Sequence, residues 1–205
     1  MKTTLKSAVA LLVALPSLAF AATWEIDPAH SSAEFSVKHM MVSNVKGSFN
    51  IEKGTVNLDD KDITKSTVEA TLDAKSVNTG NAKRDEHLRA PDFFDTAKFP
   101  TITFKSTKVE KAGEGKLKVS GNLTMHGVTK PVVLDVTGPS KESKDPWGNT
   151  RTGVEATTKL NRKDFGLTYN SALETGGVAV GEEVTVTLDL SLTKKAEATA
   201  TPAKK

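Results

Sequence analysis

The sequence predicts an all-β protein, an up-and-down antiparallel barrel of about eight strands with one short helix. Apolar and polar side chains alternate along most of the chain between residues 33 and 192, and a period of two is the pattern of a half-buried strand. Glycine-containing turns separate these runs at short intervals, as in a meander. Such strands form either a sandwich or a barrel. The short turns favour a barrel, and small inward residues (Ala33, Ala70, Gly121 and Ala156) leave room for one ligand inside it.

The first strand is expected over Ala33–His39, where every second residue is placed on one face. The same alternation predicts strands at residues 48–52, 56–58, 68–72, 102–104, 117–125, 132–136, 154–160 and 184–192. Gly121, inside one of these runs, fits a bulge or bend. Turns are expected at residues 111–115 and 126–127, and polar or glycine-containing loops at 138–149 and 169–181.

The helix is expected over Ala82–Ala90, because this stretch contains strong helix formers and Pro91 disfavours helical backbone at the preceding residue. Thr79 and Asn81 are the candidate N-caps. The segment from residue 84 to residue 104 also holds four of the eight phenylalanines of the chain. A charged helical turn followed by an aromatic pair predicts a lid or plug against an apolar interior.

The ends of the chain are expected to lie outside this domain, which spans residues 22–193. Residues 1–21 have the basic start, short apolar run and small-x-small ending of a signal peptide, with cleavage after Ala21. This predicts an exported, periplasmic protein, and the apolar run is too short for stable membrane insertion. Residues 194–205 are rich in Lys, Ala and Thr, which predicts a disordered tail. The tail is either simply solvated or touches anionic lipid weakly.

Composition excludes several classes of function. The chain has no cysteine, which rules out disulfides, thiol catalysis and cysteine metal sites. The formal net charge is +3, but the excess cations lie in the signal segment and the tail. The domain itself is slightly acidic, so it has no electrostatic footprint for nucleic acid. No cofactor is expected.

The polar residues show no catalytic or metal-binding pattern. The four histidines lie on different elements and lack metal-site spacing. His30 and His126 are expected to make hydrogen bonds in turns, and His39 to face the pore or its rim. There is no Gly-x-Ser-x-Gly motif, and the carboxylates Asp92 and Asp95 are common turn residues. The protein is therefore predicted not to be an enzyme.

The charged helix has two interpretations. Arg84 and His87 are three residues apart and share one side of it, while Asp85 and Arg89 are four apart and can pair. One interpretation is a solvated helix face. The other is a polar gate that meets the head group of an amphiphile.

Several motifs together resemble the YceI-like family. These are Arg84-Asp85-x-His87-Leu88-Arg89, Asp92-Phe93-Phe94-Asp95, Phe99-Pro100-x-Ile102-x-Phe104-x-Ser106, His30-Ser31 with the first strand, Gly121–Val132, Trp147-Gly148, Arg151 and Asp164-Phe165-Gly166. The resemblance covers residues 24–192. It implies a periplasmic, lipocalin-like protein that binds polyisoprenoids or related amphiphiles, with a homodimer as a possible assembly. The Gly-x-Trp signature of true lipocalins is absent, since Trp24 has no such glycine and is expected to precede the first strand.

The sequence therefore predicts a carrier for a long apolar or amphiphilic ligand, such as an isoprenoid quinone, a polyprenyl lipid or a fatty amide. The choice of isoprenoid follows from the resemblance alone. The alternative is a structural or stress-protective protein whose barrel is filled by its own side chains. The residues expected to meet the ligand are Phe35, Val37, His39, Phe49, Arg84, His87, Phe93, Phe94, Phe104, Leu123, Met125 and Phe165.

Overall fold

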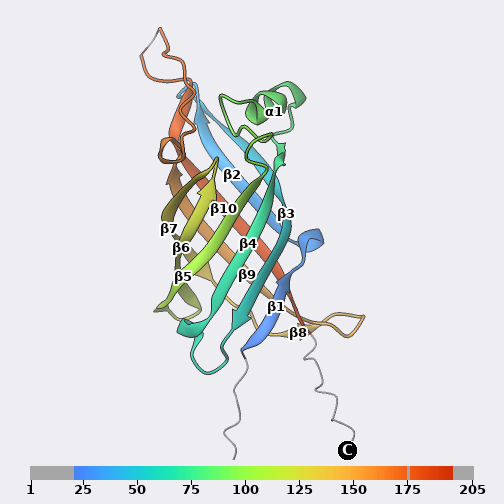
Figure 1. Ribbon diagram of the computed structural model, residues 1–205. Coiled ribbons are helices and arrows are strands. Elements are labelled where there is room, and N and C mark those ends of the chain that lie inside the picture. Colours follow the sequence, from blue (N-terminus) through green and yellow to red (C-terminus); the bar gives the residue numbers. More distant parts are fainter. Residues whose placement is uncertain (1–20, 175, 196–205) are drawn as a thin grey trace, which may run out of the picture.

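The computed structural model describes residues 21–174 and 176–195, and in this part of the chain eight long antiparallel strands close into a barrel (Figure 1). Each strand pairs with its neighbour in sequence, and the last one pairs with both the seventh and the first, which closes the barrel. The predicted all-β barrel with one short helix is thereby confirmed. Its strands are β2 (Ser32–His39), β3 (Ser43–Leu58), β4 (Thr67–Asn78), β5 (Thr101–Gly113), β6 (Lys116–Met125), β7 (Val128–Thr137), β9 (Thr150–Asn161) and β10 (Val180–Lys194).

Two short strands were not predicted. β1 (Ala22–Ile26) pairs with β10 on one side and β3 on the other, as β2 does. The two strands therefore share one position in the barrel, and the 3-10 helix η1 (Pro28–His30) lies between them in the chain. Trp24 therefore lies inside a strand, and the expectation that it precedes the first strand is wrong. β8 (Ser143–Lys144) pairs with β9 inside the region predicted as a loop. β1 does alternate, with Trp24 and Ile26 buried and Glu25 exposed, so its signal was available and was missed. β8 has only two residues, which is too short for a period of two to identify.

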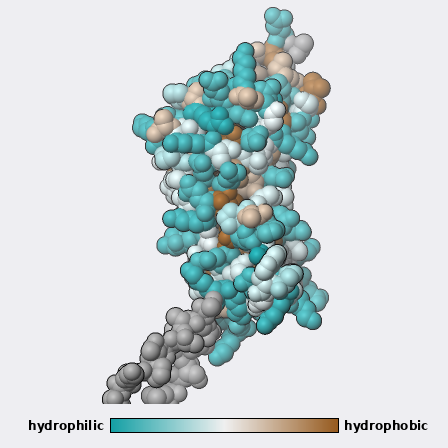
Figure 2. All heavy atoms as spheres, turned by 90° about the vertical axis from the view of Figure 1, so that its right-hand side faces the viewer, coloured by the Kyte–Doolittle hydropathy of each residue, from teal (hydrophilic) through white to brown (hydrophobic). Residues whose placement is uncertain are grey.

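The predicted apolar faces point into the barrel. In β2, for example, Phe35 lies opposite Gly47 and Val186, and Val37 lies opposite Val45 and Val184. The inward residues form three buried clusters, and each pair of clusters shares partly buried neighbours, such as Val68, Leu72 and Leu123. The outer face seen in Figure 2 is mainly hydrophilic, with apolar side chains scattered over it. The barrel is thus packed from within, as alternation along each strand requires.

Gly121 does not leave room inside the barrel, contrary to the expectation. A Cβ at this position would meet the ring of Phe104 and would lie 2.7 Å from the carbonyl oxygen of Lys105. The expected irregularity is present next to it: the register of β5 shifts between Ser106 and Lys108, opposite Gly121. Gly121 therefore accommodates the Phe104 ring, which occupies the space that a side chain would take.

The predicted helix is α1 (Ala82–Arg89), and it lies at the end of the barrel opposite to β8 (Figure 1). Asn81 is its N-cap, because its side chain accepts a hydrogen bond from the backbone N–H of Arg84 at 3.1 Å. The other candidate, Thr79, has a different partner: its backbone N–H donates to Asp85 Oδ1 at 2.8 Å. The helix ends immediately before Ala90, in agreement with the effect predicted for Pro91.

The expected Asp85–Arg89 pair does not form. Asp85 is buried against Thr79, and Arg89 donates instead to two backbone carbonyls of β4, that of Lys75 at 2.6 Å and that of Val77 at 3.0 Å. The guanidinium of Arg89 reaches these carbonyls of β4, and the two hydrogen bonds anchor the helix to the barrel.

The predicted signal segment lies outside the described residues, except for its last residue, Ala21. β10 continues through Lys194, the first residue assigned to the tail, and residues 196–205 also lie outside the described part. Within the residues described, no helix has the length and apolar character that crossing a membrane requires.

Candidate functional site

A cavity of about 200 Å³ lies inside the barrel, and we call it the barrel cavity. Its walls are almost wholly aliphatic and aromatic and come from β1 to β7, β9 and β10, with a few residues between strands such as Ile63 and Pro139. Representative lining residues are Ala70, Phe104, Leu123, Leu134, Ala156 and Leu188. An apolar cavity of this kind binds hydrocarbon in preference to water.

A second cavity, of about 550 Å³, lies at the end of the barrel next to α1, and we call it the mouth cavity. Its volume is within the range of about 300–1,000 Å³ that small-molecule sites occupy. Five residues line both cavities, so the two are neighbours along the barrel axis; they are Phe35, Phe49, Met125, Leu160 and Val186. The mouth cavity is also lined by Val37, His39, Lys83, Arg84, His87, Phe93, Phe94, Arg162 and Tyr169.

The helix α1 and the following residues through Phe94, together called the lid, contact the barrel through aromatic rings. Phe94 packs edge-on against Phe49, with ring centroids 5.2 Å apart. The rings of Phe93, His87 and Tyr169 form a second group. Their centroids are 4.8 Å apart for Phe93 and Tyr169, 5.0 Å for Phe93 and His87, and 4.9 Å for His87 and Tyr169. The lid is therefore held both to the barrel wall and to the loop between β9 and β10.

Polar contacts fix the same lid. Arg84 donates to Thr79 through Nε, at 2.7 Å from the hydroxyl oxygen, and through Nη2, at 3.0 Å from the carbonyl oxygen. His87 Nε2 lies 2.9 Å from Asp92 Oδ2. Arg84 and His87 share one side of the helix, as predicted, and both line the mouth cavity. The arrangement places polar groups at the entrance to an apolar interior.

Eleven of the twelve residues predicted to meet a ligand line one cavity or both. The exception is Phe165, which is 2% exposed and packs in a cluster with Met125 and Leu167 without lining either cavity. Phe165 ends the 3-10 helix η3 (Arg162–Phe165), where the alternation of β9 no longer applies. The lining residues that were predicted are Phe35, Val37, His39, Phe49, Arg84, His87, Phe93, Phe94, Phe104, Leu123 and Met125.

Several residues of the mouth cavity were not predicted to meet a ligand, among them Lys83, Arg162 and Tyr169. Arg162 continues the inward alternation of β9 one step beyond Leu160, a signal that was available. Tyr169 follows η3 in a loop, and no local pattern places it against the lid. Its position depends on a contact between segments about 80 residues apart in the chain.

His30, His126 and His39 lie where the sequence predicts them, in turns and at the rim of the barrel. His30 Nδ1 is 2.8 Å from Asp27 Oδ2, and His126 Nδ1 is 3.1 Å from the carbonyl oxygen of Phe165, both in turns. His39 lines the mouth cavity. No three His, Cys, Asp or Glu side chains among the described residues come close enough together to hold a metal ion.

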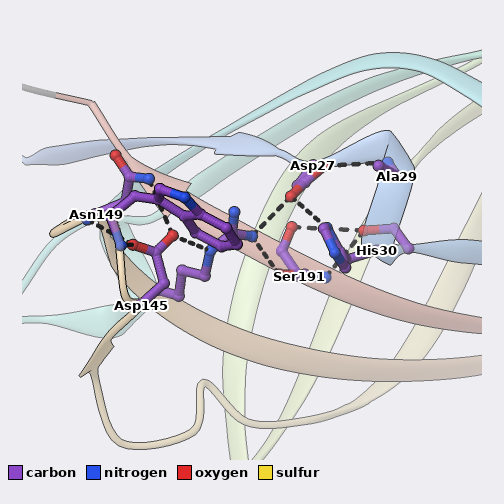
Figure 3. A network of polar contacts seen from close by, with 9 residues as sticks. Asp27, Ala29, His30, Asp145, Asn149 and Ser191 are labelled. Atoms are coloured by element: carbon purple, nitrogen blue, oxygen red, sulfur yellow. Dashed lines mark hydrogen bonds and ion pairs between the residues drawn. The ribbon is translucent and has the colours of Figure 1, made fainter.

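A polar network that includes Asp27, Asp145 and Ser191 is shown in Figure 3. Its central residue, Arg151, lies opposite Ser143 of β8, at the end of the barrel away from α1. Arg151 Nη1 donates to Asp27 Oδ2 at 2.7 Å, and Nε donates to Asp145 Oδ2 at 2.8 Å. Asp27 follows β1, and its backbone N–H donates to the carbonyl oxygen of Ser191 in β10 at 2.8 Å. The network thus ties the break between β1 and β2 to β9 and β10, which is a structural role.

The same contacts lower two carboxyl pKa values. The hydrogen bond from Arg151, with a second contribution from His30, lowers the pKa of Asp27 from 3.8 to about 2. The hydrogen bond from Arg151, followed by that from Asn149, lowers the pKa of Asp145 from 3.8 to about 2. Each ionised carboxylate therefore stabilises the folded state above pH 3.8, and this stabilisation is lost as the pH falls from 3.8 towards 2.

Arg151→Gln is expected to lower the melting temperature near neutral pH, because it removes both ion pairs at once. The difference from the wild type should shrink as the pH falls from 3.8 towards 2, where protonation removes the same interactions. Lys118→Gln is the control, since Lys118 and Asp135 form an exposed pair at 2.7 Å, and such pairs contribute about 0–1 kcal/mol. Thermal unfolding of the three proteins across this pH range measures the effect; a difference that does not change with pH would contradict it.

The chain is similar in sequence and in fold to several known proteins. A sequence profile described as the YceI-like domain matches residues 24–192. A UPF0312 protein of Vibrio cholerae is 41% identical over 168 residues, which cover 81% of this chain and 88% of the relative. The crystal structure of a Campylobacter jejuni YceI protein is similar at 31% identity and a TM-score of 0.63, covering 78% of this chain and 90% of that one. A polyisoprenoid-binding domain from Saccharophagus degradans shares the fold at 19% identity and a TM-score of 0.59, with coverage of 86% and 99%.

Proposed function

The chain belongs to the YceI-like family, and we propose that it is a periplasmic binding or carrier protein for a long apolar or amphiphilic molecule held inside the barrel. The observation that carries the proposal is the pair of neighbouring cavities. A barrel cavity with apolar walls lies below a larger mouth cavity that has polar groups at its rim. This gradient suits a molecule with a hydrocarbon tail and a polar end.

The lid supports the same proposal. It is a short helix with polar anchors and an aromatic pair, and Phe93 and Phe94 both line the mouth cavity. Closing such a segment over a bound tail removes apolar surface from water, at about 25 cal/mol per Å². Opening it would break the ring contacts of Phe93 and Phe94 together with some of the polar anchors, such as those of Arg89 to β4, without requiring the barrel strands to separate. A carrier needs both a protected interior and an entrance of this kind.

An isoprenoid tail is favoured by the resemblance to the YceI-like family, whereas the Saccharophagus degradans neighbour, at 19% identity, supports the fold alone. The cavities themselves select a long apolar shape. Isoprenoid quinones, polyprenyl lipids and fatty amides all have such a tail. The periplasmic location rests on the signal segment predicted at residues 1–21.

Mass spectrometry of protein purified from its own cells without detergent tests the proposal. Under native conditions we expect a mass above that of the polypeptide, and extraction with organic solvent should remove the excess. The denatured mass should correspond to a chain that begins at Ala22, and the native spectrum also reports any homodimer. A freshly purified protein with no extra mass would support a filled structural barrel, and a retained Met1 would contradict export.

A further inference from the structure

The charged residues that line the mouth cavity all carry positive charge. They are Lys83, Arg84 and Arg162, accompanied by the imidazoles of His39 and His87, and no Asp or Glu is among the lining residues. Within the described part of the chain, none of the three cations forms an ion pair with a carboxylate. The chain as a whole has 28 basic and 25 acidic residues. The charges lining this cavity are therefore much more one-sided than those of the chain overall.

Arg162 carries the largest electrostatic cost. It is 4% exposed, and its Nε donates to the carbonyl oxygen of Gly181 at 2.8 Å while Nη2 donates to that of Val180 at 3.2 Å. Nη1 donates to the carbonyl oxygen of Leu167. Burial lowers the pKa of its guanidinium, and the charge of Glu182 opposes this. An arginine nevertheless stays protonated, and backbone carbonyls satisfy its hydrogen bonds without neutralising its charge.

The other two cations stand at the lid. Arg84 uses Nε and Nη2 to hold Thr79, and a guanidinium has five N–H donors, so donors remain for a further acceptor. Lys83 is exposed and precedes Arg84 directly. The lid therefore presents free N–H donors beside the mouth cavity.

The carboxylates near these cations have other partners. Asp85 is buried and accepts from the backbone N–H of Thr79 at 2.8 Å. Asp92 Oδ2 lies 2.9 Å from His87 Nε2, and Glu182 accepts from Lys163 Nζ at 2.6 Å. Asp85 thus reaches Arg84 only through the Thr79 hydroxyl, and Glu182 acts on Arg162 without direct contact. Because no carboxylate lines the cavity itself, an anionic group that enters it would be the first to contact these cations directly.

We propose that the mouth cavity binds the anionic head group, a phosphate or a carboxylate, of an amphiphile whose tail lies in the barrel cavity. This rests on the proposed function and narrows it from any long apolar molecule to one with a negatively charged end. Arginine recognises phosphate and carboxylate through charge-assisted hydrogen bonds, which are about twice as strong as neutral ones. Neutral quinones and fatty amides would give these cations no direct anionic partner.

Two matched pairs of probes test this with purified, lipid-stripped protein: geranylgeranyl monophosphate against geranylgeraniol, and palmitate against hexadecanol. Each pair shares a tail and differs in head-group charge. Displacement of N-phenyl-1-naphthylamine measures the four affinities. We expect the anionic member of at least one pair to bind about tenfold tighter than its alcohol, the scale of one charge-assisted hydrogen bond.

Variants assign this preference to the cavity. Lys83→Gln should reduce the ratio of anion to alcohol affinity, and the double variant with Arg84→Gln should reduce this ratio further. Because Arg84 also holds the lid through Thr79, the ratio within each pair is compared rather than the absolute affinities. The side chain of Lys83 is exposed and makes no hydrogen bond with the described residues, so we expect its replacement to leave the fold intact. Lys98→Gln is the control: it removes the same charge from an exposed residue near the lid that does not line the cavity.

The outcomes separate the two proposals. A preference for geranylgeranyl monophosphate alone identifies a phosphate head group, and a preference for palmitate alone identifies a carboxylate; either supports the inference. Equal affinities within both pairs, or a preference that the double variant retains, would overturn it and leave the carrier function standing. If none of the four probes binds, the carrier function fails with it.

Discussion

Ala70→Phe is expected to shorten the tail that the barrel can hold. Ala70 in β4 lies opposite Gly54 and Phe104, faces inward and lines the barrel cavity of about 200 Å³. A benzyl group there would take the place of the distal carbons of a long ligand. Burial contributes about 0.8 kcal/mol per CH₂, so excluding three or four carbons costs about 3 kcal/mol, or about a hundredfold in affinity. A ligand short enough to occupy the mouth cavity alone should keep its affinity.

Dissociation constants for a series of prenyl alcohols of increasing length measure this effect. The wild type should bind more tightly with each added isoprene unit until both cavities are full, whereas Ala70→Phe should stop gaining affinity at a shorter chain. Overpacking itself costs about 1–3 kcal/mol, so the melting temperature of the variant is measured alongside. Thr71→Phe adds the same group at the next position of β4, on the opposite face, and should leave the series unchanged. Equal losses for short and long chains would contradict a tail in the barrel cavity.

Phe93→Ala is expected to accelerate ligand release far more than it lowers the stability of the barrel. Phe93 is 8% exposed and joins the lid to the loop between β9 and β10 through its contacts with His87 and Tyr169. Truncating a buried phenylalanine costs about 3–5 kcal/mol. If the lid opens without unfolding the strands, most of this cost falls on the closed lid. Release should then become faster by about a hundredfold, which corresponds to about 2.7 kcal/mol.

Phe165→Ala is the matched control for this experiment. Phe165 is also a buried phenylalanine at the same end of the barrel, but it lines neither cavity and packs with Met125 and Leu167. Its truncation should lower the melting temperature and leave the release rate close to that of the wild type. Stopped-flow release of a fluorescent fatty acid and thermal unfolding measure the two quantities. If both variants change them in the same proportion, Phe93 is an ordinary core residue and the lid is not a separate unit.

Local patterns predicted most of the cavity wall. A strand turns successive side chains to opposite faces, so alternation alone identified Phe35, Val37 and His39 as inward residues. Pairing of these strands in sequence order then brings such faces together in a closed barrel. The helix was also predictable, because its N-cap Asn81 and the proline that follows it act within a few residues.

Two of the predictions that were wrong concern contacts with groups outside the segment that carried the pattern. Asp85 was expected to pair with Arg89 on the same helix, but Thr79 and the carbonyls of β4 are the partners that folding brings nearer. Gly121 was expected to open space, but the ring of Phe104 from the neighbouring strand fills it. In both cases the competing group belongs to another element, which no pattern within the segment reveals.

The sequence by itself determined the barrel class, the inward faces of its strands, the helix and the family, because each depends on backbone geometry or motifs that act over a few residues. Only the tertiary structure decided that Tyr169 meets the lid, that Arg162 lies buried beside Arg84 and Lys83 in one cavity, and that Arg151 joins Asp27 across 124 residues. Such contacts follow from strand register and barrel closure, which set the distances between segments far apart in the chain.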